Sequence, residues 1–236
     1  MGQNKTIDIA IFSYKRPIFA QLNKSLMNIT VTQILVGLTV LISIGAFNNR
    51  ELFGKLLHSP YIEVREKDYY RFLSSGFIHA DWIHLGINMF VLWQFGGIVE
   101  AYYKSGFGAQ MGGIYYLILY LGAIIFGALP SFYKHKDNSA YRAIGASGGV
   151  SGVTLAYVVF QPWQNIYLYG IIAIPAIIAA ILYLAYSSYA GKRNRDNIGH
   201  DAHFYGAVFG FVFTLVINPS FLTHFLIKIQ NIPFLN

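Results

Sequence analysis

Long apolar runs, separated by short polar connectors, make up most of the sequence from residue 29 onwards. Runs of this length without charges are typical of helices in a lipid bilayer, where the backbone must satisfy its own hydrogen bonds. Six segments predict such helices: 29–47, 81–102, 113–132, 147–160, 166–186 and 202–217. The pattern therefore predicts an all-α, polytopic membrane protein with six transmembrane helices.

The polar segments outside these runs define the expected domain organisation. Residues 1–28 form an N-terminal tail, which we expect to be cytoplasmic or interfacial, with residues 7–12 on the membrane surface. The first apolar run of the chain follows this tail, which is too late for a cleavable signal peptide. Residues 29–222 form one membrane domain with a long first connector at 48–80, and residues 223–236 form a C-terminal tail.

Composition supports the bilayer as the main partner of this chain. Of its residues 55% are hydrophobic and 11% are charged, whereas about a quarter are charged in soluble domains. The net charge of +7 is spread over short connectors and forms no continuous stripe, so we expect no nucleic-acid partner. The chain has no cysteine, which excludes disulfides, thiol nucleophiles and thiolate metal sites.

The fourth apolar segment, 147–160, is too short to cross a bilayer alone. A helix of this length spans about 20 Å, whereas the hydrocarbon core is about 30 Å thick. The connector before it must then dip into the protein, which is tolerated where it lines a cavity or packs against protein. The alternative is a short tilted helix whose ends are covered by neighbours.

Two polar side chains in the second segment share one helical face. His84 and Asn88 are four residues apart, and His79 comes just ahead of them. Polar and ionisable residues inside a membrane usually mark a function or a bundle interior. The alternative is hydrogen bonding between helices.

A serine flanked by glycines opens the fourth segment. Ser147 is sterically accessible, and its N–H is among the donors that lack an acceptor within the helix. Both features suit a nucleophile whose tetrahedral intermediate needs an oxyanion donor. The alternative is a packing face, because Gly148 and Gly152 form a G-x-x-x-G motif.

The sixth segment opens with a histidine on a glycine face. His203, Gly206 and Gly210 lie at i, i+3 and i+7, so another backbone is expected to come close to this histidine. His200 is the alternative base. Segments two, four and six run in the same direction, so their first residues share one side of the membrane. This topology brings the polar residues of the three segments together and favours chemistry over packing alone.

In this order, these motifs resemble those of the rhomboid intramembrane serine proteases. The patterns are H-x-x-x-x-H-x-x-x-N in the second segment, G-x-S-G in the fourth and A-H-x-x-G-x-x-x-G in the sixth. Tyr70-Arg71 resembles the aromatic–arginine pair of the family, and Gly96-Gly97-Ile-Val-Glu100 resembles the end of its second helix. The resemblance covers nearly all of the chain and implies a six-helix rhomboid-like bundle.

The resemblance implies a serine endopeptidase without cofactor or metal. It implies a dyad of nucleophile and general base: Ser147 and His203. It implies oxyanion donors from three groups: His84, Asn88 and the Ser147 N–H. It implies supporting positions: His79, Gly145, Gly206 and Gly210. The implied substrates are single-pass transmembrane proteins, which reach the site sideways near the fifth segment and are cut near the membrane surface.

Two details of the expected dyad stay open. The family often has an aromatic residue four places after the nucleophile, packed on the catalytic imidazole, but this chain has Ser151 there. Either His203 is less firmly oriented here than in the family, or another aromatic residue takes this role. No carboxylate is placed to complete a triad, although Asp201 lies two residues before His203.

Two other functions fit part of the pattern. One is a catalytically inactive rhomboid-like protein that binds membrane clients. The other is a His-based metal-binding membrane protein, with ligands from four residues: His79, His84, His200 and His203. We expect a bacterial inner membrane, with the active site toward the outer side. The Lys and Arg distribution opposes this orientation, with eleven on the active-site side and six on the other.

Overall fold

The computed structural model describes residues 29–168, 171–193 and 199–233. The chain forms two units, Met1–Thr30 and Val31–Asn236, and all elements below belong to the second unit. The membrane-surface segment expected at residues 7–12 lies outside the described residues.

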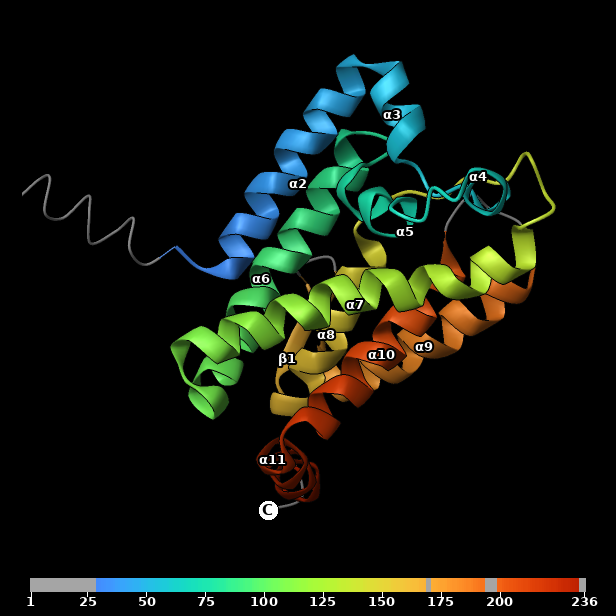
Figure 1. Cartoon of the computed structure of the whole chain (residues 1–236). Coiled ribbons are helices and arrows are strands. Elements are labelled where there is room, and N and C mark those ends of the chain that lie inside the picture. Colours follow the sequence, from blue (N-terminus) through green and yellow to red (C-terminus); the bar gives the residue numbers. More distant parts are fainter. Residues whose placement is uncertain (1–28, 169–170, 194–198, 234–236) are drawn as a thin grey trace, which may run out of the picture. The chain divides into compact units, whose positions relative to one another are not determined.

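Helices form at each of the six predicted segments, which confirms a polytopic helical fold (Figure 1). Four are long and apolar enough to cross a membrane: α2 (Val31–Asn48), α6 (Trp82–Phe107), α7 (Ala109–His135) and α10 (His200–Ile217). Two are shorter in their apolar part: α8 (Ser147–Phe160) and α9 (Ala176–Arg193).

Helix α8 forms the core of the second unit. It contacts α6, α7 and α10, and every residue from Gly148 to Phe160 except Thr154 is buried. Its bounds are those predicted for the short fourth segment. A helix hydrophobic on all sides must be surrounded by others, and here its neighbours also cover its ends.

The second and third helices are longer than expected and follow one another almost directly. Only Gly108 separates α6 from α7, at φ = 81°. This left-handed backbone conformation is accessible to glycine at little cost. The polar residues Lys104 and Ser105, taken in the prediction as a connector, extend α6 instead.

The prediction for the start of the fifth helix is wrong. Strands β1 (Asn165–Leu168) and β2 (Ile172–Pro175) form an antiparallel hairpin, in which Ile166 pairs with Ile174. Helix α9 begins only at Ala176. Isoleucine-rich apolar runs suit a strand as well as a helix, and Pro175 disfavours a helix that continues through it.

The long first connector is folded. It contains four short elements: α3 (Arg50–Leu56), α4 (Pro60–Glu66), α5 (Arg71–Ser74) and the 3₁₀ turn η1 (Ser75–Phe77). The buried Arg71 donates to the carbonyl oxygens of Gly54 and Leu57 at 2.8 and 3.2 Å. It also pairs with the Asp68 carboxylate at 3.1 Å. Arg71 therefore holds the connector together.

Glu100, at the end of the glycine-containing motif in α6, binds the start of α2. Its carboxylate accepts hydrogen bonds from the backbone N–H groups of Val31 and Thr32, both at 2.9 Å. Lys104 pairs with the same carboxylate at 2.6 Å. A buried carboxylate is thus compensated by a cation and by the unpaired donors of a helix start.

A further helix, α11 (Pro219–Gln230), crosses the boundary expected at residue 222. Asn218 caps it by accepting a hydrogen bond from the Ser220 N–H at 2.9 Å. Its Phe221 is buried in the core. His224 lies 3.0 Å from the Phe160 carbonyl oxygen, so α11 closes the far end of α8.

Candidate active site

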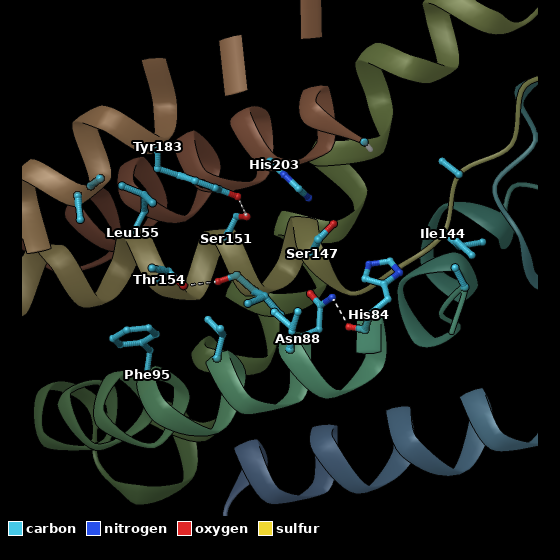
Figure 2. A pocket seen from close by; sticks show the side chains of 18 of the residues that line it. His84, Asn88, Phe95, Ile144, Ser147, Ser151, Thr154, Leu155, Tyr183 and His203 are labelled. Atoms are coloured by element: carbon cyan, nitrogen blue, oxygen red, sulfur yellow. Dashed lines mark hydrogen bonds between the residues drawn. The ribbon is translucent and has the colours of Figure 1, made fainter. Parts of the chain in front are cut away.

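A cavity of about 790 Å³ lies between α6, α8, α9 and α10, and four of the predicted site residues line it. They come from the starts of three helices: His84, Asn88, Ser147 and His203. Figure 2 shows the Ser147 side chain and the His203 imidazole pointing toward one another, with His84 and Asn88 on the opposite side of Ser147. The structure therefore brings together residues that are up to 119 positions apart, from His84 to His203.

The loop before Ser147 is held by the folded first connector. Its backbone pairs His58 with Ala143 in an antiparallel bridge, and the Gly145 N–H donates to the Ser75 carbonyl oxygen at 2.9 Å. Ala146, adjacent to Ser147, is fully buried. The segment before Ser147 is thus packed against protein, as expected. This packing fixes the start of α8.

His79 does not line this cavity but lies behind it, fully buried. Its Nε2 accepts a hydrogen bond from the Ala146 N–H at 3.3 Å, and its Nδ1 lies 3.0 Å from the Ser43 hydroxyl. The neutral tautomer with hydrogen on Nδ1 satisfies both contacts. Burial lowers the pKa of His79 to about 4, which keeps this ring neutral.

His84 and Asn88 lie in the first two turns of α6. Asp81 caps the helix, because its carboxylate accepts from the His84 N–H at 2.8 Å. The Asn88 amide donates one hydrogen to the His84 carbonyl oxygen at 2.9 Å. Among the described residues, the second amide hydrogen and the His84 ring form no further hydrogen bond, and both residues border the cavity.

Gly145 makes room for the His84 ring. Its φ is 115°, and a Cβ placed there would lie 2.7 Å from His84 Cε1. Any other residue at this position would therefore strain the backbone and displace the imidazole. The G-x-S-G motif combines this requirement with the accessibility of Ser147.

Helices α8 and α10 touch backbone to backbone along their glycines. A Cβ on Gly206 would overlap the backbone of Gly148, and one on Gly210 would overlap that of Gly152. Both glycine pairs are thus in direct main-chain contact, as expected for small-x-x-x-small packing. The packing alternative and the catalytic interpretation of these motifs are compatible, because the contact brings α8 and α10 together at Ser147 and His203.

His200 and Asp201 lie on the other side of Ser147. Both line a neighbouring cavity of about 480 Å³, which Ser147 also borders. The Asp201 carboxylate lies 3.6 Å from Lys134 Nζ. His200 is buried and separated from the cavity of His84 and Asn88, which His203 lines.

Sequence reasoning missed Tyr183, which also lines the larger cavity. This residue of α9 stacks against His203 with ring centroids 6.1 Å apart and an interplanar angle of 24°. Its hydroxyl lies 2.5 Å from that of Ser151. Two signals were available: Ser151 in place of the family's aromatic residue, and the spacing of Tyr183 and Tyr186 on one helical face. Neither identifies Tyr183, because apolar spans often carry such pairs.

The rest of the larger cavity is an apolar groove. Its walls come from α6, α8, α9 and β1, and include Ile87, Val91, Phe95, Leu155, Val158 and Ile166. In the described part of the chain, no group of three or more His, Asp or Glu residues lies close enough to hold a metal ion. His79 and His84 are near neighbours, with ring centroids 4.9 Å apart, but they form no such group with His200 and His203.

Comparison with known proteins agrees with this arrangement. The chain is 28% identical over 189 residues to "Rhomboid-like protein 11, chloroplastic" of Arabidopsis thaliana, covering 76% of this chain and 64% of that protein. It is 27% identical over 153 residues to "Rhomboid protein 1, mitochondrial" of Saccharomyces cerevisiae, covering 63% and 42%. The chain thus spans less than two thirds of the length of either relative. The sequence model of the Rhomboid domain matches residues 66–220, which include α6, α8, α9 and α10, and the chain therefore belongs to the rhomboid family.

Proposed function

We propose that this rhomboid-family chain is an intramembrane serine endopeptidase with Ser147 as nucleophile and His203 as general base. The observation that carries the proposal is the convergence of a glycine-flanked serine and an imidazole on one cavity. Two further donors, His84 and Asn88, border the same space. Structural packing alone requires no such combination of groups.

The chemistry follows from the roles that these groups suit. The Ser147 hydroxyl attacks the scissile carbonyl carbon while His203 takes its proton. The negative charge that develops on the carbonyl oxygen is stabilised by His84, Asn88 and the Ser147 N–H. The intermediate then collapses, the amine leaves with the proton from His203, and a water molecule hydrolyses the acyl-enzyme by the same steps.

The apolar groove supports a transmembrane segment as substrate. From Ser147 to Val158 it follows α8 for about 16 Å at 1.5 Å per residue. Side chains of α6 and α9 form its two sides, so lateral access between these helices is proposed. The substrates are single-pass membrane proteins cut where their helix unwinds into the polar end of the groove.

The location of the protein is defined only in part. Its helices and family make it an integral membrane protein. The names of the relatives place those proteins in chloroplasts and mitochondria, so they do not support the expected bacterial inner membrane. A cytoplasmic N-terminus, with the active site on the opposite side, stays a proposal that protease accessibility of tagged termini would test.

The proposed function is tested with the chain in liposomes and a panel of single-pass membrane proteins. We expect the wild-type chain to cleave at least one of them and a fluorophosphonate probe to label Ser147. Ser147→Ala should abolish both, whereas Ser139→Ala, at an exposed position in the preceding connector, should abolish neither. Normal cleavage by the Ser147→Ala chain would overturn the nucleophile assignment. Binding of the substrates without cleavage or labelling would favour the inactive, client-binding alternative.

A further inference from the structure

Three helices meet at the side chain of Tyr183. The residue belongs to α9, its ring stacks on His203 of α10, and its hydroxyl contacts Ser151 of α8. Figure 2 shows the side chain reaching from α9 to Ser151. Ser151 lies one turn beyond Ser147 and is 4% exposed, so little of this residue is open to solvent.

Both ends of the Tyr183 side chain are therefore fixed. A hydroxyl–hydroxyl distance of 2.5 Å indicates a short hydrogen bond, and it holds the phenolic oxygen in place, so the ring cannot swing away from His203 without breaking it. The face of the Tyr183 ring then limits the movement of the His203 imidazole on one side. Aromatic pairs have preferred orientations, so the stacked ring favours one orientation of the imidazole.

A second ring contact links the same two helices. Tyr186 lies three residues after Tyr183 and meets His200, three residues before His203, with ring centroids 5.6 Å apart and an interplanar angle of 85°. Between the antiparallel helices α9 and α10, two tyrosines thus contact two histidines. Only Tyr183 also lines the cavity that contains Ser147.

We propose that Tyr183, anchored by the Ser151 hydroxyl, is the positioning residue that orients His203 toward Ser147. The inference rests on the proposed function, since it assigns the support of its general base. Helix α9 also forms one wall of the groove, through Ala176, Ala179 and Ala180. Helix α9 therefore has two roles in this proposal. It orients the base through Tyr183, and it forms the wall past which the substrate reaches the site.

The first test separates support of the base from contact with the substrate. A small fluorophosphonate reacts with Ser147 without filling the groove, so its rate of labelling reports the dyad and the oxyanion donors but not binding in the groove. We expect Tyr183→Ala to lower this rate and kcat by about 10- to 100-fold, which is part of the roughly 100- to 10,000-fold that a general base typically contributes. Tyr186→Ala, a tyrosine on the same helix that lies outside the cavity, should match the wild-type chain.

The second test addresses the anchor. Tyr183→Phe and Ser151→Ala each remove one partner of the hydroxyl pair, and each should slow labelling by about threefold. Because they break one interaction, the double variant should be no slower than either single variant. Independent, multiplying effects would contradict an anchoring role for Ser151.

The third test moves the aromatic residue from α9 to α8 and thereby controls for loss of folding. In Tyr183→Ala/Ser151→Phe, the phenyl ring comes from α8 and occupies the volume that the tyrosine vacates. We expect labelling to recover at least tenfold over Tyr183→Ala, with melting temperatures measured for every variant. A folded relocated variant without recovery would overturn the inference.

The result for the wild-type chain distinguishes failure of the proposed function from failure of the inference about Tyr183. If it neither cleaves nor is labelled at Ser147, the proposed function fails and the inference fails with it. If it is active and Tyr183→Ala is equally active, the inference alone is wrong.

Discussion

His79 Nε2 accepts a hydrogen bond from the Ala146 N–H at 3.3 Å, immediately before the proposed nucleophile. The same imidazole contacts Ser43 of α2 through Nδ1, and the Ser43 hydroxyl donates to the Phe77 carbonyl oxygen at 3.0 Å. His79 thus links the first helix, the first connector and the loop that carries Ser147. A histidine that does not line the cavity is in this way tied to the residue before Ser147.

This link predicts a loss of stability in acid. The neutral ring is favoured in the folded chain, where its pKa is about 4, against 6.5 for a free histidine. The unfolded chain therefore binds the additional proton between these values, and stability falls as the pH drops from about 6.5 to about 4. At pH 5 the loss from this group should reach about 2 kcal/mol.

The measurement compares denaturant unfolding of the wild-type chain and His79→Gln in detergent at pH 7.5 and pH 5. Glutamine keeps an acceptor for the Ala146 N–H but does not titrate in this range. We expect a smaller difference between the two pH values for the variant. Equal differences would mean that the protonation of His79 does not limit stability.

Removal of an oxyanion donor should slow the reaction without unfolding the chain. His84→Ala and Asn88→Ala are each expected to lower kcat about 100-fold or more, because a lost donor typically costs about 2.7–4 kcal/mol of barrier. Single-turnover cleavage in liposomes provides the measurement. Ile83→Ala is the matched control, since this neighbour on α6 is 75% exposed and lies outside the cavity. Wild-type rates for both donor variants would remove these residues from the proposed mechanism.

Gly145→Ala should disturb the site more than its small size suggests. Its φ of 115° strains any L-residue, and its methyl group would press on the His84 ring. We expect a loss of at least tenfold in kcat. Gly86→Ala serves as the control, because a Cβ there meets nothing within 4 Å. An active Gly145→Ala chain with unchanged labelling kinetics would show that the loop relaxes freely.

The glycine contact between α8 and α10 predicts a cost for any added methyl group. Gly210→Ala would overlap the Gly152 backbone, so the helices must separate. Overpacking of this kind typically costs about 1–3 kcal/mol. Gly97→Ala in α6 meets open space and should be neutral or slightly stabilising. Unfolding in mild detergent checks both variants, and equal stability would contradict the close contact.

Most of the site was predictable from the direction of the helices. His84, Ser147 and His203 lie at the starts of alternate spans, and alternate spans run in the same direction. The glycine spacing at Gly148, Gly152, Gly206 and Gly210 likewise predicted two backbones in contact. Both arguments rest on regular geometry, which a sequence pattern reports directly.

The fifth span shows where this reasoning ends. Residues 166–175 are as apolar as a transmembrane helix, and hydropathy does not separate a buried strand from a helix. The hairpin depends on pairing between Asn165–Leu168 and Ile172–Pro175, which a local pattern does not contain. Tyr183 was missed for a similar reason. A tyrosine on an apolar span has the same appearance whether it meets lipid or a catalytic imidazole.

The glycine contact between α8 and α10 has a consequence for how the dyad tolerates change. The gap between the two helices is set by main-chain atoms, whose radii are the same in every variant of the protein. Substitutions elsewhere in the bundle alter side-chain volumes but leave this spacer intact. The separation of the proposed nucleophile and base is therefore little affected by substitutions in the surrounding bundle.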